Sequence, residues 1–141
     1  MKLLPFFLFI VLFATSLKAQ PIDRFPIYPG CDRYMQYNHK LNGCFQERMT
    51  KDLDLYVKSV QPKHDSIAPI QVKLSMIVDQ NGKIKSIEVL ESENRKAANQ
   101  LVHRVNQLQH YFEKHHKKIK PAMVGRRNVN FKMVFIGSQY L

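Results

Sequence analysis

Two cysteines are the residues of this chain best suited to carry chemistry. The segment from Cys31 to Cys44 spans fourteen residues and includes His39. A cysteine near a base can act as a nucleophile, and a cysteine pair can bind a metal or form a disulfide. Zinc would need a further ligand, and this spacing fits no zinc motif. The choice among a disulfide, a metal site and a reactive thiol depends on the compartment in which the protein is found.

The first nineteen residues predict export. Lys2 is followed by an apolar or small run from Leu3 to Leu17, and then by Lys18 and Ala19. This order is typical of a cleaved signal peptide, and the run is short for a helix that crosses a bilayer. We expect cleavage near Ala19 and a periplasmic or secreted mature protein. In that oxidising environment the cysteines are expected to form one disulfide, which contributes about 3 kcal/mol.

The six histidines do not form a recognisable catalytic pattern. His103 and His110 would share one helix face, yet no serine or acid stands at an obvious spacing to orient them. His115 and His116 lie in a lysine-rich stretch and are expected to be solvated. No glycine-rich phosphate loop and no metal motif are present. The sequence therefore predicts a protein that is not an enzyme, with no cofactor and no catalytic or metal-binding residue.

The chain is basic, with a formal net charge of +11. Exported basic proteins meet anionic lipid headgroups or cell wall, and export makes nucleic acid an unlikely partner. One cluster near the end of the chain comprises Lys114, Lys117, Lys118, Lys120, Arg126 and Arg127. These side chains are either solvated charges at a helix end or a patch that contacts an anionic surface such as cell wall.

Hydrophobic periodicity predicts two amphipathic helices. The first begins near Asn38 and ends at Pro62, with apolar residues at helical spacing that include Leu41, Phe45, Met49, Leu53 and Val60. The second follows Ser92, a plausible N-cap, and its apolar stripe runs through Ala97, Ala98, Leu101, Val102, Val105, Leu108 and Phe112. Lysines near its end suit the negative pole of the helix, and Pro121 prevents its continuation.

In three segments, apolar and polar residues alternate with a period of two, and these segments are predicted to be strands. Ile70 to Val78 is the clearest, and Asn81 and Gly82 then supply turn residues that tolerate positive φ. Ile84, Ile87 and Val89 carry the second strand of this hairpin. The range 128–136 forms the third. We expect an α+β fold in which a three-stranded antiparallel sheet, ordered 2-1-3, has helices on one face and the third strand on an edge.

Four motifs occur in this order along the chain: "FPIYPGCDR", "GCFQERM", "VDQNGKI" and "IKPAMVGRRNVNFKMVF". They resemble TonB C-terminal-domain proteins, especially exported stand-alone forms with a PGC motif and a paired cysteine. The resemblance implies a domain over residues 38–141, preceded by an extended segment over residues 20–37.

In that family the last strand binds a short segment of an outer-membrane transporter by strand addition. The matching residues here are Val129, Asn130, Phe131, Lys132, Met133, Val134 and Phe135. An energy-transducing TonB protein has a membrane anchor and a long proline-rich spacer. Here about ten residues, each adding at most ~3.6 Å, separate the signal from the folded region. A soluble binding module is therefore expected, with a cell-wall-binding, adaptor or inhibitor module as the alternative.

The edge formed by the last strand has two interpretations. An exposed edge is usually blunted by proline, a bulge or charges, and residues 128–136 contain neither proline nor glycine and only Lys132 as a charge. The edge is either covered, by the tail "GSQYL" or by a second chain in a homodimer, or it accepts a strand from a partner protein.

Overall fold

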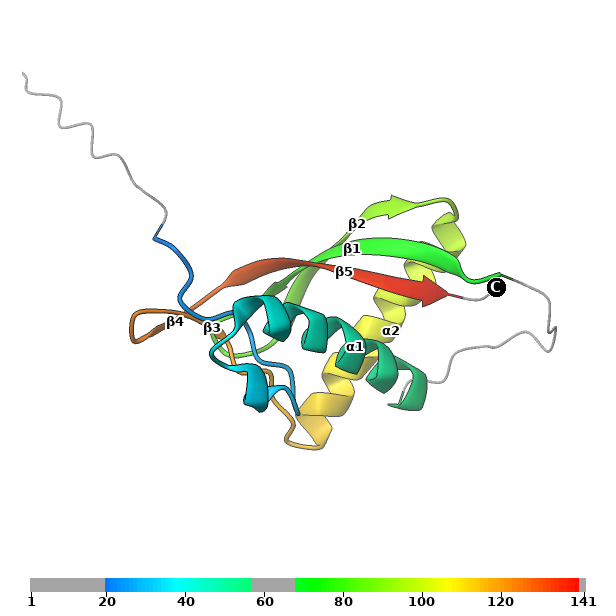
Figure 1. The fold of residues 1–141 in the computed structure, drawn as a ribbon. Helices are drawn as coiled ribbons and strands as arrows, with labels where there is room; N and C mark the ends of the chain where they lie inside the picture. The colour runs from blue at the N-terminus through cyan, green and yellow to red at the C-terminus, as the bar shows by residue number, and fades with distance from the viewer. Residues whose placement is uncertain (1–19, 57–67, 140–141) are drawn as a thin grey trace, which may run out of the picture.

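The computed structural model describes residues 20–56 and 68–139 of the chain. Its main sheet is antiparallel with the order β2-β1-β5, and two long helices accompany it (Figure 1). The predicted α+β class and strand order are confirmed. The long elements are α1 (Asn38–Tyr56), β1 (Ile70–Val78), β2 (Ile84–Ser92), α2 (Arg95–Lys114) and β5 (Phe131–Gln139). Three short ones are the 3-10 helix η1 (Asp32–Tyr34) and the hairpin strands β3 (Ala122–Val124) and β4 (Arg127–Val129).

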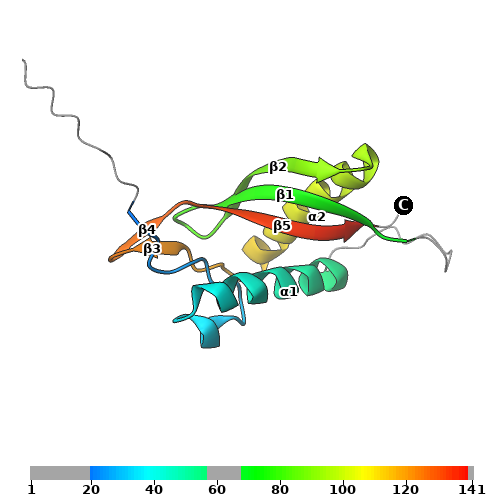
Figure 2. The same cartoon turned by 45° about the horizontal axis from the view of Figure 1, so that its top comes forward.

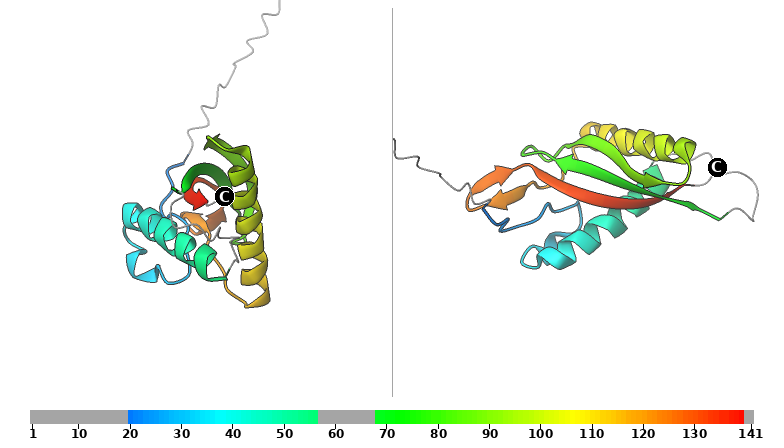
Figure 3. Two further views of the ribbon diagram at one scale, coloured as in Figure 1. Left: turned by 90° about the vertical axis from the view of Figure 1, so that its right-hand side faces the viewer. Right: turned by 90° about the horizontal axis from the view of Figure 1, so that it is seen from above.

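Both helices lie on the same side of the sheet. In Figure 1 they are below it, with α1 in front and α2 behind, and Figure 2 shows α1 running beside β5. The alternating pattern of β1 explains this arrangement, because Val72, Leu74, Met76 and Val78 are all fully buried. These side chains belong to one core cluster with the apolar stripes of both helices. The opposite face of the sheet is left without a helix (Figure 3).

The hairpin between β1 and β2 depends on one glycine. Of the predicted turn pair, only Gly82 has a positive φ, at 77°. A Cβ atom on Gly82 would lie 1.9 Å from the Ile119 carbonyl oxygen, so the backbones approach closely here. Asp79 closes the turn, since its Oδ1 accepts hydrogen bonds from the backbone N–H groups of Asn81 at 2.8 Å and Lys83 at 3.0 Å. Sequence and packing therefore both require glycine at this position.

Helix α1 begins at the predicted residue, whereas α2 begins later than predicted. The N-cap of α2 is Asn94, whose side chain accepts from the N–H groups of Lys96 and Ala97. Ser92, the predicted N-cap, is the last residue of β2, and its hydroxyl hydrogen-bonds to the backbone of Asn94. The predicted end of the first helix, including Val60 and Pro62, lies outside the described residues.

Helix α2 ends at Lys114, several residues before the proline expected to stop it. His116 adopts a φ of 53°. The Lys117 N–H donates to the Phe112 carbonyl at 3.0 Å, and the His116 N–H donates to the Glu113 carbonyl at 3.5 Å. This is a Schellman ending, in which a non-glycine residue occupies the left-handed position.

The last strand differs from the prediction at both ends. The predicted range 128–136 includes Val129, which lies in β4, and Asn130, which lies in no strand. The reason is a tight turn at Gly125, where φ is 57°, which folds β4 back onto β3. Strand β5 therefore begins at Phe131, and it continues to Gln139 because its pairing with β1 extends that far.

Candidate functional site at the edge of β5

Strand β5 forms one edge of the sheet and has a regular backbone. It pairs with β1 without interruption from Phe131, opposite Val78, to Gln139, opposite Ile70. In an antiparallel strand, alternate residues direct both backbone polar groups to the same side. The groups of Lys132, Val134, Ile136 and Ser138 therefore point away from β1, toward the free edge. This edge offers a template on which another extended chain could pair.

The opposite edge is less suitable. The pairing of β2 with β1 has two register shifts, and Ser86, which lies within one of them, has a φ of 51°. Bulges of this kind twist a strand and interrupt its ladder, which is a common way to protect an edge. The described part of the sheet thus has one irregular edge and one regular edge.

Side chains of β5 divide cleanly between the two faces of the sheet. Met133 and Phe135 are buried in the core, whereas Val134 and Ile136 are 41% and 54% exposed. Lys132, also on the outer face, lies 3.7 Å from a carboxylate oxygen of Glu88. A strand added beside β5 would cover the two exposed apolar side chains.

One side chain of α1 reaches the free edge. The Nε2 of Gln46 donates to the Val134 carbonyl at 2.6 Å, and its Oε1 accepts from the Ile136 N–H at 3.2 Å. Among the residues that the structure describes, no other side chain hydrogen-bonds to the outward backbone groups of β5. No sequence pattern indicates this contact, because Gln46 is an ordinary polar residue of an amphipathic helix.

The structure brings together five of the seven predicted partner-binding residues. Phe131, Lys132, Met133, Val134 and Phe135 lie on β5. Val129 belongs to the β3–β4 hairpin, and Asn130 accepts a hydrogen bond from the Gln80 N–H at 3.0 Å. The predicted strand reached Ile136, but the predicted partner-binding residues ended at Phe135, and Ser138 was not expected on this edge. Of the tail "GSQYL", the first three residues belong to β5 itself, and the other two lie outside the described residues.

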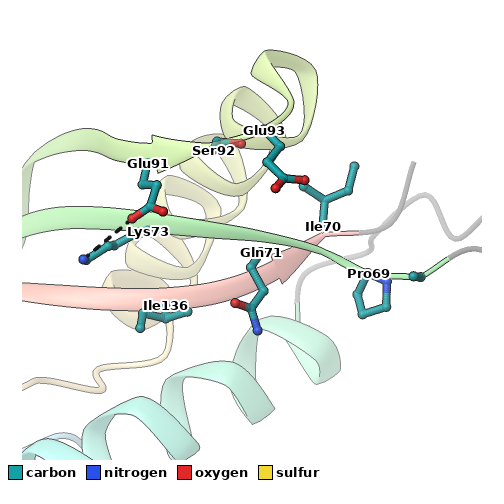
Figure 4. A pocket seen from close by; sticks show the side chains of 9 residues that line it. Pro69, Ile70, Gln71, Lys73, Glu91, Ser92, Glu93 and Ile136 are labelled. Atoms are coloured by element: carbon teal, nitrogen blue, oxygen red, sulfur yellow. Dashed lines mark ion pairs between the residues drawn. The ribbon is translucent and has the colours of Figure 1, made fainter.

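A hollow of about 510 Å³ lies near one end of the sheet, where β1 begins and β2 ends (Figure 4). Its lining includes Ile136, Gln71 and an ion pair between Lys73 and Glu91, whose charged atoms are 3.8 Å apart. Lys73 is partly exposed and Glu91 is largely exposed, so solvent weakens this ion pair and it contributes little to stability. The hollow adjoins the β5 edge through Ile136, and it could receive a side chain from a strand bound there.

The disulfide holds the start of α1 against the N-terminal segment. Cys31 and Cys44 are bonded, as predicted, and both are buried. Beside them, the fully buried Tyr28 donates its hydroxyl to Asp52 of α1 at 3.0 Å. Burial raises the pKa of Tyr28 well above its ordinary value, and the Asp52 carboxylate raises it further. Tyr28 therefore stays neutral and acts as a hydrogen-bond donor that positions α1.

The basic residues of the predicted patch differ in what they contact and in where they lie. Lys117 lies over the rings of Tyr56 and Tyr111, with its Nζ 4.7 and 5.4 Å from their centroids. Lys120 forms an ion pair with Asp32, which holds the pKa of that carboxyl below its usual range. Lys114 and Lys118 are exposed near the end of α2, and Arg126 and Arg127 are exposed on the β3–β4 hairpin. Figures 1 and 3 show this hairpin away from the end of α2.

A buried arginine was also missed by the sequence analysis. Arg104 of α2 is 6% exposed, and its guanidinium donates to the Leu53 carbonyl at 2.9 Å and to Gln139 Oε1 at 3.0 Å. It therefore joins the end of α1 and the end of β5, the two elements that flank the candidate site. Its only sequence signal is a charge next to the apolar stripe of α2.

Two further observations concern residues 20–56 and 68–139. No group of three or more His, Cys, Asp or Glu side chains in these ranges could hold a metal ion. No helix in these ranges is both long and apolar enough to cross a membrane. Comparisons with protein-family models, with curated proteins and with solved structures found no significant match to this chain.

Proposed function

We propose that this protein is an exported protein-binding module of the TonB C-terminal-domain type, and that it binds an extended segment of a partner by strand addition at β5. The observation that carries the proposal is the regular β5 edge, which pairs with β1 over nine residues while the other edge carries two register shifts. Backbone pairing would supply affinity, and side-chain contacts on alternate residues would supply selectivity.

Several features support a partner of this kind. Val134 and Ile136 offer apolar contacts on the outer face, and the hollow beside Ile136 offers a place for one larger side chain. The four ordered sequence motifs favour the exposed segment of an outer-membrane transporter as the partner. The disulfide, together with the expected signal peptide, supports a periplasmic or secreted location.

The proposal can be tested by NMR titration of the isotope-labelled protein, isolated from the cell envelope, with peptides taken from exposed segments of outer-membrane transporters. We expect the largest amide shifts from residue 131 to residue 139, with new protection from hydrogen exchange at Lys132, Val134, Ile136 and Ser138. Strongest shifts on the exposed face of α1 or at the β3–β4 hairpin would contradict strand addition, as would the absence of binding to every peptide.

A matched pair of substitutions sharpens this test. Val134→Pro removes an N–H that points to the free edge, and proline is tolerated at such positions because no ladder bond to β1 is lost. Val134→Thr keeps both this N–H and the branched side chain. We expect Val134→Pro to abolish peptide binding and Val134→Thr to retain it, with both proteins folded as judged by their amide spectra.

A second function rests on the exposed arginines of the β3–β4 hairpin. Arg126 and Arg127 are exposed there, and the chain as a whole is strongly basic. This favours contact with anionic cell wall as the alternative to peptide binding. Co-sedimentation with purified cell wall across a salt series tests it, and Arg126→Ala with Arg127→Ala should abolish binding if the hairpin is responsible.

A further inference from the structure

The contact between Gln46 and β5 imitates the backbone of a neighbouring strand. In a parallel strand, one residue would present its N–H to the carbonyl of Val134 and its C=O to the N–H of Ile136. The Gln46 amide presents the same donor and acceptor, at 2.6 and 3.2 Å. The two bonds also determine the orientation of the amide, since a flipped amide would place donor against donor and acceptor against acceptor. The side chain therefore takes the place of the hydrogen-bonding groups of one residue of an added strand.

The backbone that carries Gln46 is held firmly. Cys44, two residues earlier, is tied to Cys31 by the disulfide, and Phe45 is fully buried in the core. The helix cannot leave β5 without removing Phe45 from the core. The side chain of Gln46 is half-buried and is connected through rotatable bonds, so it can turn away alone.

The site occupied by Gln46 coincides with the apolar part of the edge. Val134 and Ile136, whose backbone groups Gln46 satisfies, are also the exposed apolar residues of β5. A strand that covered both side chains would need the same two backbone groups.

From these observations, and on the basis of the function proposed above, we propose that the partner strand binds along the free edge of β5 and displaces the Gln46 side chain, which satisfies the edge in the free protein. The contact limits affinity, because each partner must replace two existing hydrogen bonds. It also protects the edge, because a free row of backbone groups would pair with other chains.

The test compares Gln46→Ala with Asn42→Ala. Asn42 is an exposed amide one turn earlier on α1, and it forms no hydrogen bond to β5. In the free proteins, Gln46→Ala should speed hydrogen exchange at the Ile136 amide by about tenfold, and Asn42→Ala should leave it unchanged. With the same transporter-derived peptides, Gln46→Ala should bind about three to ten times more tightly than the unmodified protein. Asn42→Ala should bind like the unmodified protein.

The outcomes separate the two proposals. Unchanged exchange at Ile136 in Gln46→Ala would show that the amide does not occupy the edge, and it would overturn the inference. Faster exchange with equal or weaker peptide binding would overturn displacement while leaving strand addition intact. Binding of no peptide by either protein would overturn the proposed function, and the displacement with it.

Discussion

Arg104 and Gln139 join the middle of α2 to the end of β5. Nη1 of the buried arginine donates to Oε1 of the glutamine at 3.0 Å, and Nη2 donates to the Leu53 carbonyl and to Asp54. One side chain thus holds the last turn of α1 and the last residue of β5 in a common position. Such a buried charge is costly to remove, because Gln139 and the Leu53 carbonyl lose the hydrogen bond from Arg104 while remaining buried.

We predict that Arg104→Met lowers the free energy of unfolding by about 2–3 kcal/mol, because the replacement fills the space but leaves Gln139 and the Leu53 carbonyl without this donor. Urea denaturation measures the change. Lys96→Met, at an exposed position of the same helix, should change it by less than about 0.5 kcal/mol. Equal effects of the two substitutions would show that the buried network adds nothing.

The turn after β1 should make stability depend on acid pH. Burial would raise the pKa of Asp79, but hydrogen bonds from the Lys83 backbone, the Lys85 ammonium and the Asn81 backbone outweigh it and hold that pKa below its ordinary value. A lowered pKa in the folded protein favours folding at pH above about 4, and this gain is lost as the pH falls further. We predict that Asp79→Asn costs about 1 kcal/mol at pH 7.

The difference between Asp79→Asn and the unmodified protein should shrink as the pH falls below about 4, where the carboxyl of the unmodified protein takes up its proton. Thermal unfolding at a series of pH values measures it. Lys85→Met, which removes only the 3.0 Å ion pair, should show a smaller loss with the same trend. A difference that stays constant down to the lowest pH would contradict this explanation.

Gly82 and Gly125 both have a positive φ, so alanine substitutions there measure the loss of stability caused by a side chain in the left-handed region. The two positions differ in whether a Cβ atom would clash with a neighbour. At Gly82 a Cβ would meet the Ile119 backbone, whereas at Gly125 it would meet no atom within 4 Å. We predict that Gly82→Ala lowers the free energy of unfolding by about 2–4 kcal/mol, and that Gly125→Ala costs about 1 kcal/mol. Calorimetry should rank them in this order, and the reverse order would exclude the close approach at Ile119.

His116 offers a stabilising substitution. It occupies the left-handed position that ends α2, where glycine is preferred. We predict that His116→Gly raises the free energy of unfolding by about 0.5–1 kcal/mol, while Gln107→Gly, at an exposed position inside the helix, lowers it by a similar amount. Chemical denaturation of both variants is the measurement. A loss of stability in His116→Gly would mean that the imidazole contributes contacts beyond the helix end.

The disulfide should stabilise the protein mainly by reducing the conformational entropy of the unfolded chain. Replacing Cys31 and Cys44 together by alanine removes a link across a fourteen-residue loop, and we predict a loss of about 3 kcal/mol. Denaturation of the double variant, compared with the unmodified protein with and without reductant, measures it. Reductant should have no effect on the double variant. If it destabilises that variant too, its action on the unmodified protein cannot be assigned to the disulfide.

Local patterns in the sequence determined the elements of this protein. The two-residue period of Ile70 to Val78, the glycine after Asn81 and the apolar stripe of α2 each act within a few residues, so they predict structure directly. The same patterns predicted the sheet order, because a hairpin followed by a helix returns the last strand beside the first. The disulfide could be predicted because a disulfide is the simplest role for two cysteines in a protein that is expected to be exported.

Only the tertiary structure decided which side chains contact the β5 edge and where this strand begins. Gln46 meets Val134 and Ile136 across 88 and 90 positions of sequence, and Arg104 meets Gln139 across 35. A long polar side chain has the same local pattern whether it is solvated or bonded to a distant backbone, so no periodic signal distinguishes these cases. The start of β5 likewise depended on the turn at Gly125 and on pairing with β1. Hydrogen bonds between distant segments depend on how the helices pack against the sheet, and so they cannot be read from local sequence patterns.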